Sequence, residues 1–388
     1  MSASVPVLVL GGGVTGLGVL RAFGRRGLPV HLVAPPGDPA WRSRHAREVP
    51  GGVPPARESQ LAEYLAPLPL ERAMLFPCSD SWAHAVAGLP REVAARFRSS
   101  SPSGEALGQM TDKARFAELA RRAGVAHPST WPLAGAADLD AVPDGAFESA
   151  FLKPRDSQAF FRHYRVKAFW VRSREEAARR LADATAAGLE MQLQSYVPGP
   201  PANHVFVDGF VDRAGTVRCR FVRRRLRMYP PDFGNSTAME SIAPADAPAA
   251  VEAAERLLSA TGYRGVFSLE TKQDERTGAC HALELNPRAW WFVSFAVECG
   301  ADVCRLAYED ALGDAVETIT SYRVGRRCAY PYYDWHAAGA RRGGPAGAAA
   351  WAMEMALAHQ PVWAWDDPWP AVGGALAVAR RRAIRGGS

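Results

Sequence analysis

Lysine is scarce in this chain of 388 residues. Of its 46 basic residues, only Lys113, Lys153, Lys167 and Lys272 are lysines, and all the others are arginines. The ammonium of lysine is a compact point charge on a flexible stem, which the planar guanidinium of arginine cannot fully imitate. A lysine in an arginine-rich chain is therefore a better functional candidate than an ordinary surface lysine. For Lys272, chance survival remains an open explanation.

Long apolar runs and paired cysteines are also missing. No stretch approaches the roughly 18 apolar residues of a membrane-spanning helix, so we expect no membrane span. Residues 1–4 carry no basic segment ahead of the apolar run 5–10, and we expect no signal peptide. The six cysteines form no CxxC pair, which argues against disulfides and zinc and fits a reducing cytoplasm.

The overall composition is that of an ordinary globular protein, with 48% hydrophobic and 22% charged residues. The length allows two or three subdomains around a substantial core. A net charge of +6 raises the question of whether the protein binds nucleic acid. No basic stripe interleaved with aromatic residues accompanies it, so we expect no nucleic-acid partner and attribute the charge to arginine bias and a phosphate site.

The N-terminal residues predict a βαβ unit and therefore a parallel sheet. An apolar strand at 5–10 is followed by a glycine turn, a helix at 17–26 and a second strand at 30–33. Gly11, Gly13 and Gly16 satisfy the GxGxxG pattern of dinucleotide-binding enzymes. The acidic residue expected at the end of the second strand is missing, because Asp38 comes only after two prolines. We therefore expect the glycines to make a tight turn, and NAD or FAD binding is the weaker interpretation.

Further along the chain, residues 100–104 form a small-residue linker, and Thr111 is expected to cap a helix that ends at Gly124. Two hairpins are predicted, one from strands at 204–211 and 216–223 and one from strands at 265–272 and 279–286. Residues 292–312 read as mostly helical. Residues 228–237 read as a loop that lines a substrate pocket.

The strongest chemical signal lies on the second hairpin. Glu284 and Asn286 are two residues apart on one strand, so their side chains share a face, and Glu270 can stand opposite them on the preceding strand. Three oxygen-bearing side chains suit Mg²⁺, which prefers hard oxygen ligands and keeps room for water and phosphate. Arg288 adds a fixed positive charge. A solvated surface explains the pattern poorly, because the flanking residues are apolar and a buried carboxylate pair needs a cation or a proton.

At these residues the chain resembles the ATP-grasp superfamily, and the resemblance covers about residues 105–312. The segment Phe151-Leu152-Lys153-Pro154 and the dipeptide Asp112-Lys113 look like the family positions whose lysines contact ATP. Residues 194–199 resemble the hinge whose backbone reads the adenine edge. The resemblance implies that Glu270, Glu284 and Asn286 hold Mg²⁺ and that Lys153 and Arg288 take part in catalysis. The ATP contacts that we expect are Lys113, Lys153, Gln194, Ser195, Tyr196, Val197, Asp208, Arg218 and Arg220.

The resemblance also implies an architecture. The expected fold class is α/β, with an ATP-grasp fold of two α+β subdomains that grip ATP, preceded by a Rossmann-like α/β domain. We expect this first domain over residues 1–104 and the ATP-grasp domain over 105–320, with a lid subdomain at about 127–200. A helical tail over 321–388 is expected to pack on the ATP-grasp core.

Three features depart from the family pattern. Ser195 stands where many relatives carry Glu, and His204 stands where a ribose-contacting Glu is common. Residues 155–167 lack the glycines of the usual phosphate-covering loop, so polar side chains would have to replace backbone amides there. The N-terminal third, together with the Asp366-Asp367-Pro368-Trp369-Pro370 segment, looks like the carboxylate–amine ligase branch that includes D-aspartate ligases.

The predicted function is therefore an ATP-dependent carboxylate–amine ligase that works through an acyl phosphate. ATP and Mg²⁺ are the expected cofactors, with Mn²⁺ as a substitute, and a carboxylate and an amine are the expected small-molecule substrates. Candidate substrate contacts are Asp80, Arg223, Arg225 and Arg227, although a solvated basic face explains the arginines equally well. A homodimer is left open. The alternatives are a dinucleotide-dependent oxidoreductase and an ATP-grasp scaffold that binds without catalysis.

Overall fold

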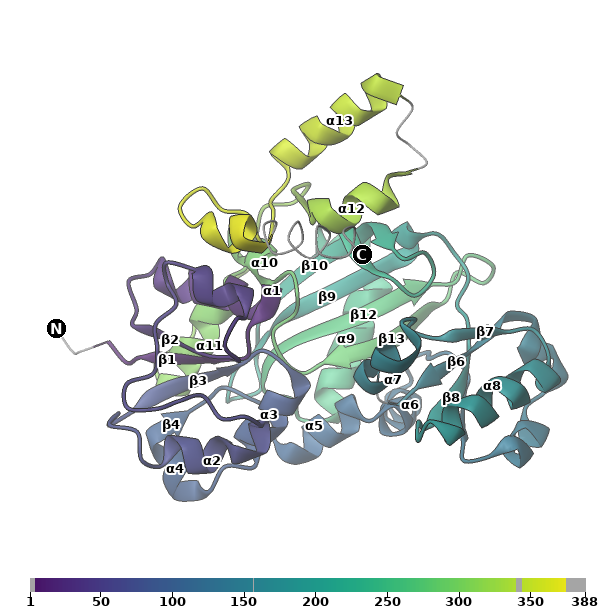
Figure 1. Cartoon of the computed structure of the whole chain (residues 1–388), viewed down its shortest axis with the longest axis horizontal. Coiled ribbons are helices and arrows are strands. Elements are labelled where there is room, and N and C mark those ends of the chain that lie inside the picture. The colour runs from purple at the N-terminus through teal and green to yellow at the C-terminus, as the bar shows by residue number, and fades with distance from the viewer. Residues whose placement is uncertain (1–3, 156, 340–343, 375–388) are drawn as a thin grey trace, which may run out of the picture.

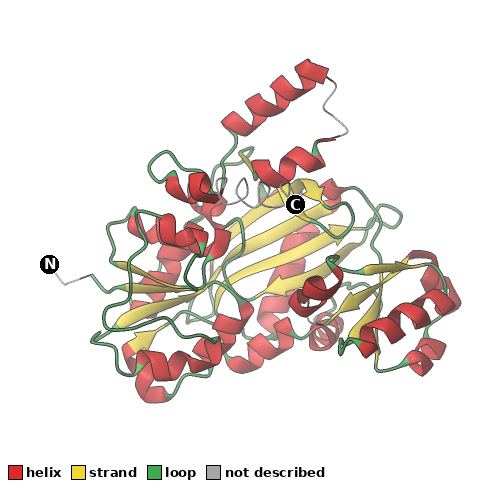
Figure 2. Cartoon of the chain, viewed as in Figure 1, coloured by secondary structure: helices red, strands yellow, loops and turns green. Residues whose placement is uncertain are grey.

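The computed structural model describes residues 4–155, 157–339 and 344–374 of the chain. The described residues form three β-sheets with helices packed around them (Figure 1). In Figure 2, helices flank the strands of the sheets. No helix in these ranges is both long and apolar enough to cross a bilayer.

The N-terminal sheet is parallel, as its βαβ opening predicts. Its four strands are ordered β2-β1-β3-β4, and every residue of the first three is buried. One face packs on α1 and the other on the short helices that follow β2 and β3. The elements are β1 (Val7–Leu10), α1 (Gly13–Gly24), β2 (Val30–Val33), α2 (Leu61–Leu65), β3 (Ala73–Pro77), α3 (Asp80–Ala87), α4 (Arg91–Arg96) and β4 (Phe97–Arg98).

A small subdomain follows two linking helices, α5 (Gly104–Thr111) and α6 (Lys113–Arg122). Its antiparallel sheet has the order β5-β8-β6-β7, and α8 covers one face with a core of its own. The other face is turned toward the large sheet (Figure 1). The elements are β5 (Thr130–Leu133), β6 (Ala150–Pro154), α7 (Ser157–Tyr164), β7 (Phe169–Val171), α8 (Arg174–Ala186) and β8 (Met191–Ser195).

The large sheet has six strands in the order β13-β12-β9-β10-β11-β14. One face packs on α6 and α9, and the other shares a continuous apolar core with α1 of the N-terminal unit, α10 and α11. The elements are β9 (His204–Val211), β10 (Val217–Tyr229), β11 (Asn235–Ile242), α9 (Pro248–Ala260), β12 (Gly265–Gln273), β13 (Cys280–Asn286), α10 (Val293–Cys299), α11 (Val303–Leu312) and β14 (Arg327–Ala329).

The C-terminal segment adds α12 (Pro331–Ala337) and α13 (Gly344–Leu357) and then returns to the N-terminal unit. There, Arg21 of α1 donates to the carboxylate of Asp367 at 2.9 Å, and both side chains are almost fully buried. Residues 375–388 of the predicted tail lie outside the described residues. Short 3-10 helices complete the chain at Pro39–Arg42, Glu58–Gln60, Ala136–Ala141, Asp144–Ser149, Pro201–Asn203 and Pro244–Asp246.

Both predicted hairpins are present, but two local predictions were wrong. Asp112, and not Thr111, caps α6, because its carboxylate accepts from the first free N–H groups of that helix. Part of the predicted loop at 228–237 is strand, since β10 runs to Tyr229 and β11 begins at Asn235. The prediction that residues 292–312 are mostly helical is confirmed: α10 and α11 fill most of the segment, and Gly300, with a φ of 99°, ends α10.

Candidate active site

The carboxylates of the β12–β13 hairpin face each other across the two strands. Glu270 lies directly opposite Glu284, and Ser268 lies opposite Asn286. Because side chains of cross-strand neighbours point to the same side of a sheet, Glu270, Glu284 and Asn286 share one face. The structure therefore brings together the three predicted metal ligands. Glu284 is exposed, whereas Glu270 is held in the sheet by neighbouring side chains.

Two side chains hold the same oxygen of Glu270. Its Oε1 accepts from Arg225 Nη2 at 2.9 Å and from His204 Nδ1 at 2.8 Å. Burial would raise the pKa of Glu270, but Arg225 and His204 outweigh it and hold that pKa far below its usual range. Burial lowers the pKa of His204 to about 4, so its ring is neutral at pH 7 and donates through Nδ1–H. Glu270 is therefore an anion, as a metal ligand must be.

Arg288 connects the hairpin to the N-terminal unit. Its guanidinium donates to Asp80 at the start of α3, at 2.8 and 3.4 Å, and to Oδ1 of Asn286 at 3.0 Å. Asp80 follows the carboxyl end of β3, which is the edge where parallel sheets bind ligands. The predicted substrate contact and the predicted catalytic arginine are thus neighbours.

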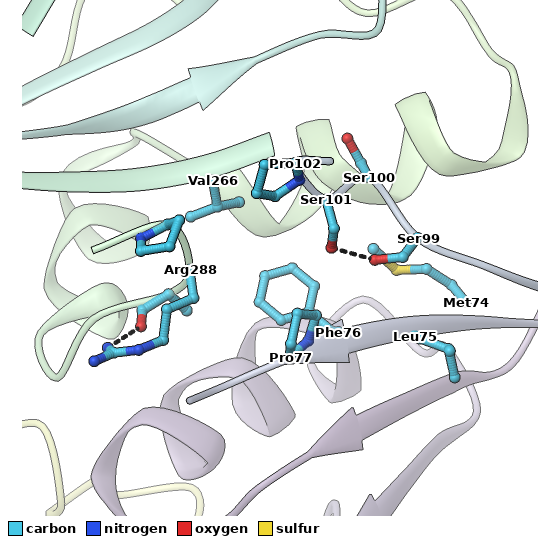
Figure 3. Close-up of a pocket in the computed structure, with 12 residues that line it drawn as sticks. Met74, Leu75, Phe76, Pro77, Ser99, Ser100, Ser101, Pro102, Val266 and Arg288 are labelled. Atoms are coloured by element: carbon cyan, nitrogen blue, oxygen red, sulfur yellow. Dashed lines mark hydrogen bonds between the residues drawn. The ribbon is translucent and has the colours of Figure 1, made fainter. Parts of the chain in front are cut away.

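A cavity beside Arg288 is too small for a substrate. It is lined by Phe76, Pro77, Pro102 and Val266, among others, and its volume is about 10 Å³ (Figure 3). That volume holds at most one water molecule. This cavity is therefore not a substrate site.

Each of the four lysines belongs to the small subdomain or contacts it. Lys153 points away from the small-subdomain core, because its neighbour Leu152 points into it. Lys113 donates to the carbonyl oxygens of Pro154 and Arg155, just beyond Lys153. Lys167 donates to Asn235 of β11 at 2.6 Å, and Glu270 and Glu284 lie close enough to act electrostatically on its ammonium.

Lys272 is the fourth member of this group, which we call the lysine cluster. It is buried on β12, donates to the hydroxyl of Tyr196 at 3.1 Å and lies 4.3 Å from the centre of the Tyr196 ring. Burial lowers its pKa to about 8. Lys167 and Lys272 were not among the predicted site residues, although the scarcity of lysine made every lysine a better candidate than usual.

The predicted hinge residues lie at the end of β8 and just after it. Gln194 is buried and donates to Thr130, and Val197 is also buried. The backbone N–H groups of Ser195 and Tyr196 donate to the carbonyl oxygens of Ser129 and Ser149 within the small subdomain. Tyr196 is the hinge side chain that reaches the large sheet, through Lys272.

The arginine run on β10 does not converge on the site. Arg218 pairs with Asp212 and Thr318, and Arg220 pairs with Glu255 of α9, so neither predicted phosphate contact lies with Glu270. Strand alternation turns Arg220 toward the α9 side of the sheet and Arg223 and Arg225 toward the other side.

The remaining predicted contacts on β9 and β10 are used inside the protein. Asp208 is fully buried in an ion pair with Arg223, whose guanidinium lies 4.0 Å from the Phe206 ring centre. Arg227 pairs with the buried Asp334 of α12 at 2.8 and 2.9 Å. Of the three arginines predicted to contact substrate, only Arg225 lies against the metal-ligand set.

The N-terminal glycine turn is filled by a side chain of the protein itself. The carboxylate of Asp38 accepts from the backbone N–H of Gly13, the first residue of α1, at 3.0 and 3.1 Å. A Cβ at Gly12 would come within 2.3 Å of this carboxylate. A dinucleotide pyrophosphate would need the same N–H groups and would meet a negative charge there.

The structure is similar to solved enzymes over most of their length. The carboxyaminoimidazole ribonucleotide synthase of Aspergillus clavatus, solved with ATP, gives a TM-score of 0.63 at 17% identity, covering 89% of this chain and 88% of that one. The corresponding synthetase of Thermus thermophilus gives 0.61 at 21% identity, covering 83% and 82%. The chain has the ATP-grasp fold.

A third ATP-grasp structure is the biotin carboxylase domain of the Hydrogenobacter thermophilus 2-oxoglutarate carboxylase, solved as a dimer with MgADP, ADP and bicarbonate. Its TM-score is 0.62 at 17% identity, over 84% of this chain and 74% of that one. No protein-family model matches the chain, and no curated protein matches it in sequence. At these identities the comparisons establish the fold, and the chemistry must be argued from the residues.

Proposed function

We propose that this ATP-grasp protein is a carboxylate–amine ligase, which uses ATP and Mg²⁺ to convert a carboxylate to an acyl phosphate and then joins it to an amine. The observation that carries the proposal is that Glu270, Glu284 and Asn286 share one face of the large sheet, with Lys167 close enough to both carboxylates for them to act on its ammonium. An oxygen-rich metal site beside phosphate-binding lysines is what phosphoryl transfer requires. The structural neighbours solved with ATP or MgADP support the same ligands here.

The donor set fits Mg²⁺, which keeps water and phosphate among its ligands, better than it fits a metal ion whose ligands all come from the protein. Two carboxylates and one amide oxygen leave positions for water and phosphate, as Mg²⁺ sites do. Among the described residues, no group of three or more His, Cys, Asp and Glu side chains is placed to hold a metal. A bound Mg²⁺ would neutralise the phosphate oxygens, and Mn²⁺ is proposed as a substitute with the same ligand preference.

The protein's own groups account for the rest of the chemistry. Lys153 and Lys113 would bind the phosphates, and positioning with charge neutralisation is most of what phosphoryl transfer asks of a protein. The substrate carboxylate oxygen attacks the γ-phosphorus, the bond to the β-phosphate oxygen breaks, and ADP leaves. The amine then attacks the acyl carbon, phosphate departs with its bonding electron pair, and the amine loses a proton.

Arg288 is proposed to stabilise the oxyanion of this second step, because it lies beside Asn286 and opposite Asp80. Asp80 keeps the guanidinium in place and lies at the ligand-binding edge of the N-terminal sheet. We propose that the acid or the amine binds beside this pair, on the side of Asn286 and Glu284. A homodimer is also proposed, by analogy with the dimeric biotin carboxylase neighbour.

The test is the identity of the nucleotide product and the capture of the intermediate. Amino acids and other small carboxylic acids are screened in pairs with amines for ADP release. ADP and phosphate are expected, and hydroxylamine should replace the amine to give a hydroxamate. AMP as the product would reject the mechanism, because adenylation attacks the α-phosphate. ADP without any hydroxamate would favour a kinase, and ATP binding without turnover would favour a scaffold.

A further inference from the structure

Four aromatic rings meet between the small sheet and the large sheet. Phe233, in the loop between β10 and β11, lies with its ring centre 4.6 Å from that of Phe151, 5.0 Å from that of Trp170 and 6.3 Å from that of Tyr196. Phe151 is on β6, Trp170 is on β7, and Tyr196 follows β8. One side chain of the large sheet's longest hairpin is therefore surrounded by three rings of the small subdomain.

These three rings mark a surface suited to a nucleotide base. Phe151 shares a strand face with Lys153, which lies two residues further on, so the rings adjoin the lysine proposed to bind phosphate. Tyr196 contacts Lys272 at the opposite end. Flat aromatic side chains bind bases by stacking, because every base presents a π-face. This reading rests on the proposed function, since it assumes that the protein binds ATP between the two sheets.

We propose that Phe233 occupies the place of the nucleotide base in the ligand-free protein and that ATP binds only when the β10–β11 loop withdraws. Phe233 is then a residue that sets nucleotide affinity by competing with the base for the same rings. In the ligand-free form it also joins the small subdomain to the large sheet.

The loop is built to present this side chain. Asp232 has a φ of 70°, and a Cβ at Gly234 would lie 1.9 Å from the carbonyl oxygen of Pro230, so the chain turns back sharply on both sides of Phe233. Only glycine permits so close an approach of two backbone segments. The turn projects the ring beyond the end of the β10–β11 pair, into the small subdomain.

The same loop is connected to the metal-ligand set. Asn235 accepts from Lys167 at 2.6 Å, and the hydroxyl of Ser236 accepts from Arg225 Nε at 2.8 Å. Arg225 also donates to Glu270. Asn235 and Ser236 directly follow the loop at the start of β11, so withdrawal of Phe233 would act on the neighbours of the residues that hold Lys167 and Arg225.

The competition predicts a change in affinity of defined sign. When the binding-competent form is a minor fraction of the protein, the apparent dissociation constant is raised by the inverse of that fraction. Phe233→Ala removes the competing ring and should tighten ATP binding by about tenfold, if about one molecule in ten is competent in the wild type. Adenosine should gain by a similar factor, because the effect acts through the base.

The experiment measures the dissociation constants of ATP and adenosine by calorimetry, without acid or amine substrates. Phe233→Tyr keeps a ring and should bind as the wild type does. Tyr332→Ala, which removes an exposed aromatic side chain from α12, is the matched control and should also leave both constants unchanged. Thermal unfolding confirms that each variant is folded.

Tighter binding by Phe233→Ala, or binding by that variant alone, supports the proposal. Equal or weaker binding by Phe233→Ala overturns it, because a ring that stacks on the bound base would weaken binding when removed. Failure of every folded form to bind ATP would instead reject the proposed function, and this inference with it. The two failures are thus distinguishable.

Discussion

Arg225 donates a hydrogen bond to Glu270 at 2.9 Å, and this ion pair is nearly buried, with the Arg225 side chain only 5% exposed. Replacing Glu270 would leave a buried guanidinium without its anion, which typically costs about 3–5 kcal/mol of stability. Glu284, directly opposite and exposed, carries no such cost. The metal-ligand assignment is therefore best tested at Glu284.

Glu284→Gln should reduce ADP release by about 100-fold or more, because one charged ligand of the phosphate-bound cation is lost. The residual activity should need a higher Mg²⁺ concentration, measured by titrating Mg²⁺ at saturating ATP. Glu252→Gln, on the exposed side of α9, is the control and should match the wild type. Wild-type activity and Mg²⁺ dependence in Glu284→Gln would contradict the assignment.

Lys153→Ala should weaken ATP binding by about 1.5–3 kcal/mol, the scale of a hydrogen bond to a charged group. Lys153→Arg should not restore it, because a guanidinium does not replace a compact ammonium at such a site. Calorimetry with ATP measures both, and Arg179→Ala on the exposed part of α8 serves as the control. If Lys153→Ala bound ATP with wild-type affinity, the proposed role of Lys153 in ATP binding would be wrong.

Two neighbouring aspartates of the C-terminal segment should differ sharply in their effect on stability. Asp367 is fully buried and paired with Arg21, whereas Asp366 is 45% exposed and paired with Arg25. Asp367→Asn should lower the free energy of unfolding by about 3 kcal/mol, and Asp366→Asn by less than about 1 kcal/mol. Urea unfolding measures the free energy of unfolding of both variants. Equal losses would show that the buried pair of Arg21 and Asp367 does not anchor the C-terminal segment.

Stability should fall in mild acid because of His359. Its Nε2 lies 3.0 Å from Ser294 Oγ, and burial, followed by Arg25 and Arg21, lowers its pKa to about 4 from the ordinary 6.5. Between pH 6.5 and about pH 4, His359 is protonated in the unfolded chain but stays neutral in the native state. The free energy of unfolding therefore decreases as the pH falls. His359→Gln should therefore lose about 2 kcal/mol less between pH 7 and pH 5. Identical losses in urea titrations would contradict this.

The glycine turn should not bind a dinucleotide, because the Asp38 carboxylate already accepts from Gly13. Titration with NADH should give no saturable fluorescence enhancement at micromolar concentration. Asp38→Ala should destabilise the protein by about 0.5–2 kcal/mol, as the loss of a helix cap does. Micromolar NADH binding by the wild type would restore the oxidoreductase alternative.

The sequence predicted most of the strands and the shared face of Glu270, Glu284 and Asn286, because both depend on local alternation. Glu284 and Asn286 had to share a face once residues 280–286 formed a strand, and the apolar neighbours of Glu270 placed the opposite strand. The fold class followed from the family resemblance and is confirmed by the ATP-grasp neighbours.

What the sequence did not predict depends on pairing between distant segments. Nothing near Arg218 and Arg220 showed that their side of β10 would meet Glu255 of α9. The burial of Asp208 required Arg223 on the neighbouring strand to supply its counter-charge. Phe233 belonged to a predicted loop, and its three ring contacts come from strands far away in the chain.

The ε-amino groups of the chain surround one region of the protein. Reagents that react with amines would therefore modify this region almost exclusively. An acylating reagent would modify the lysine cluster and the α-amino group, so the protection of lysines by ATP can be followed in one mass spectrum. The four peptide bonds that a lysine-specific protease could cleave lie in the same region. Because Lys272 is buried, cleavage after it would report opening of its surroundings, without labels or engineered probes.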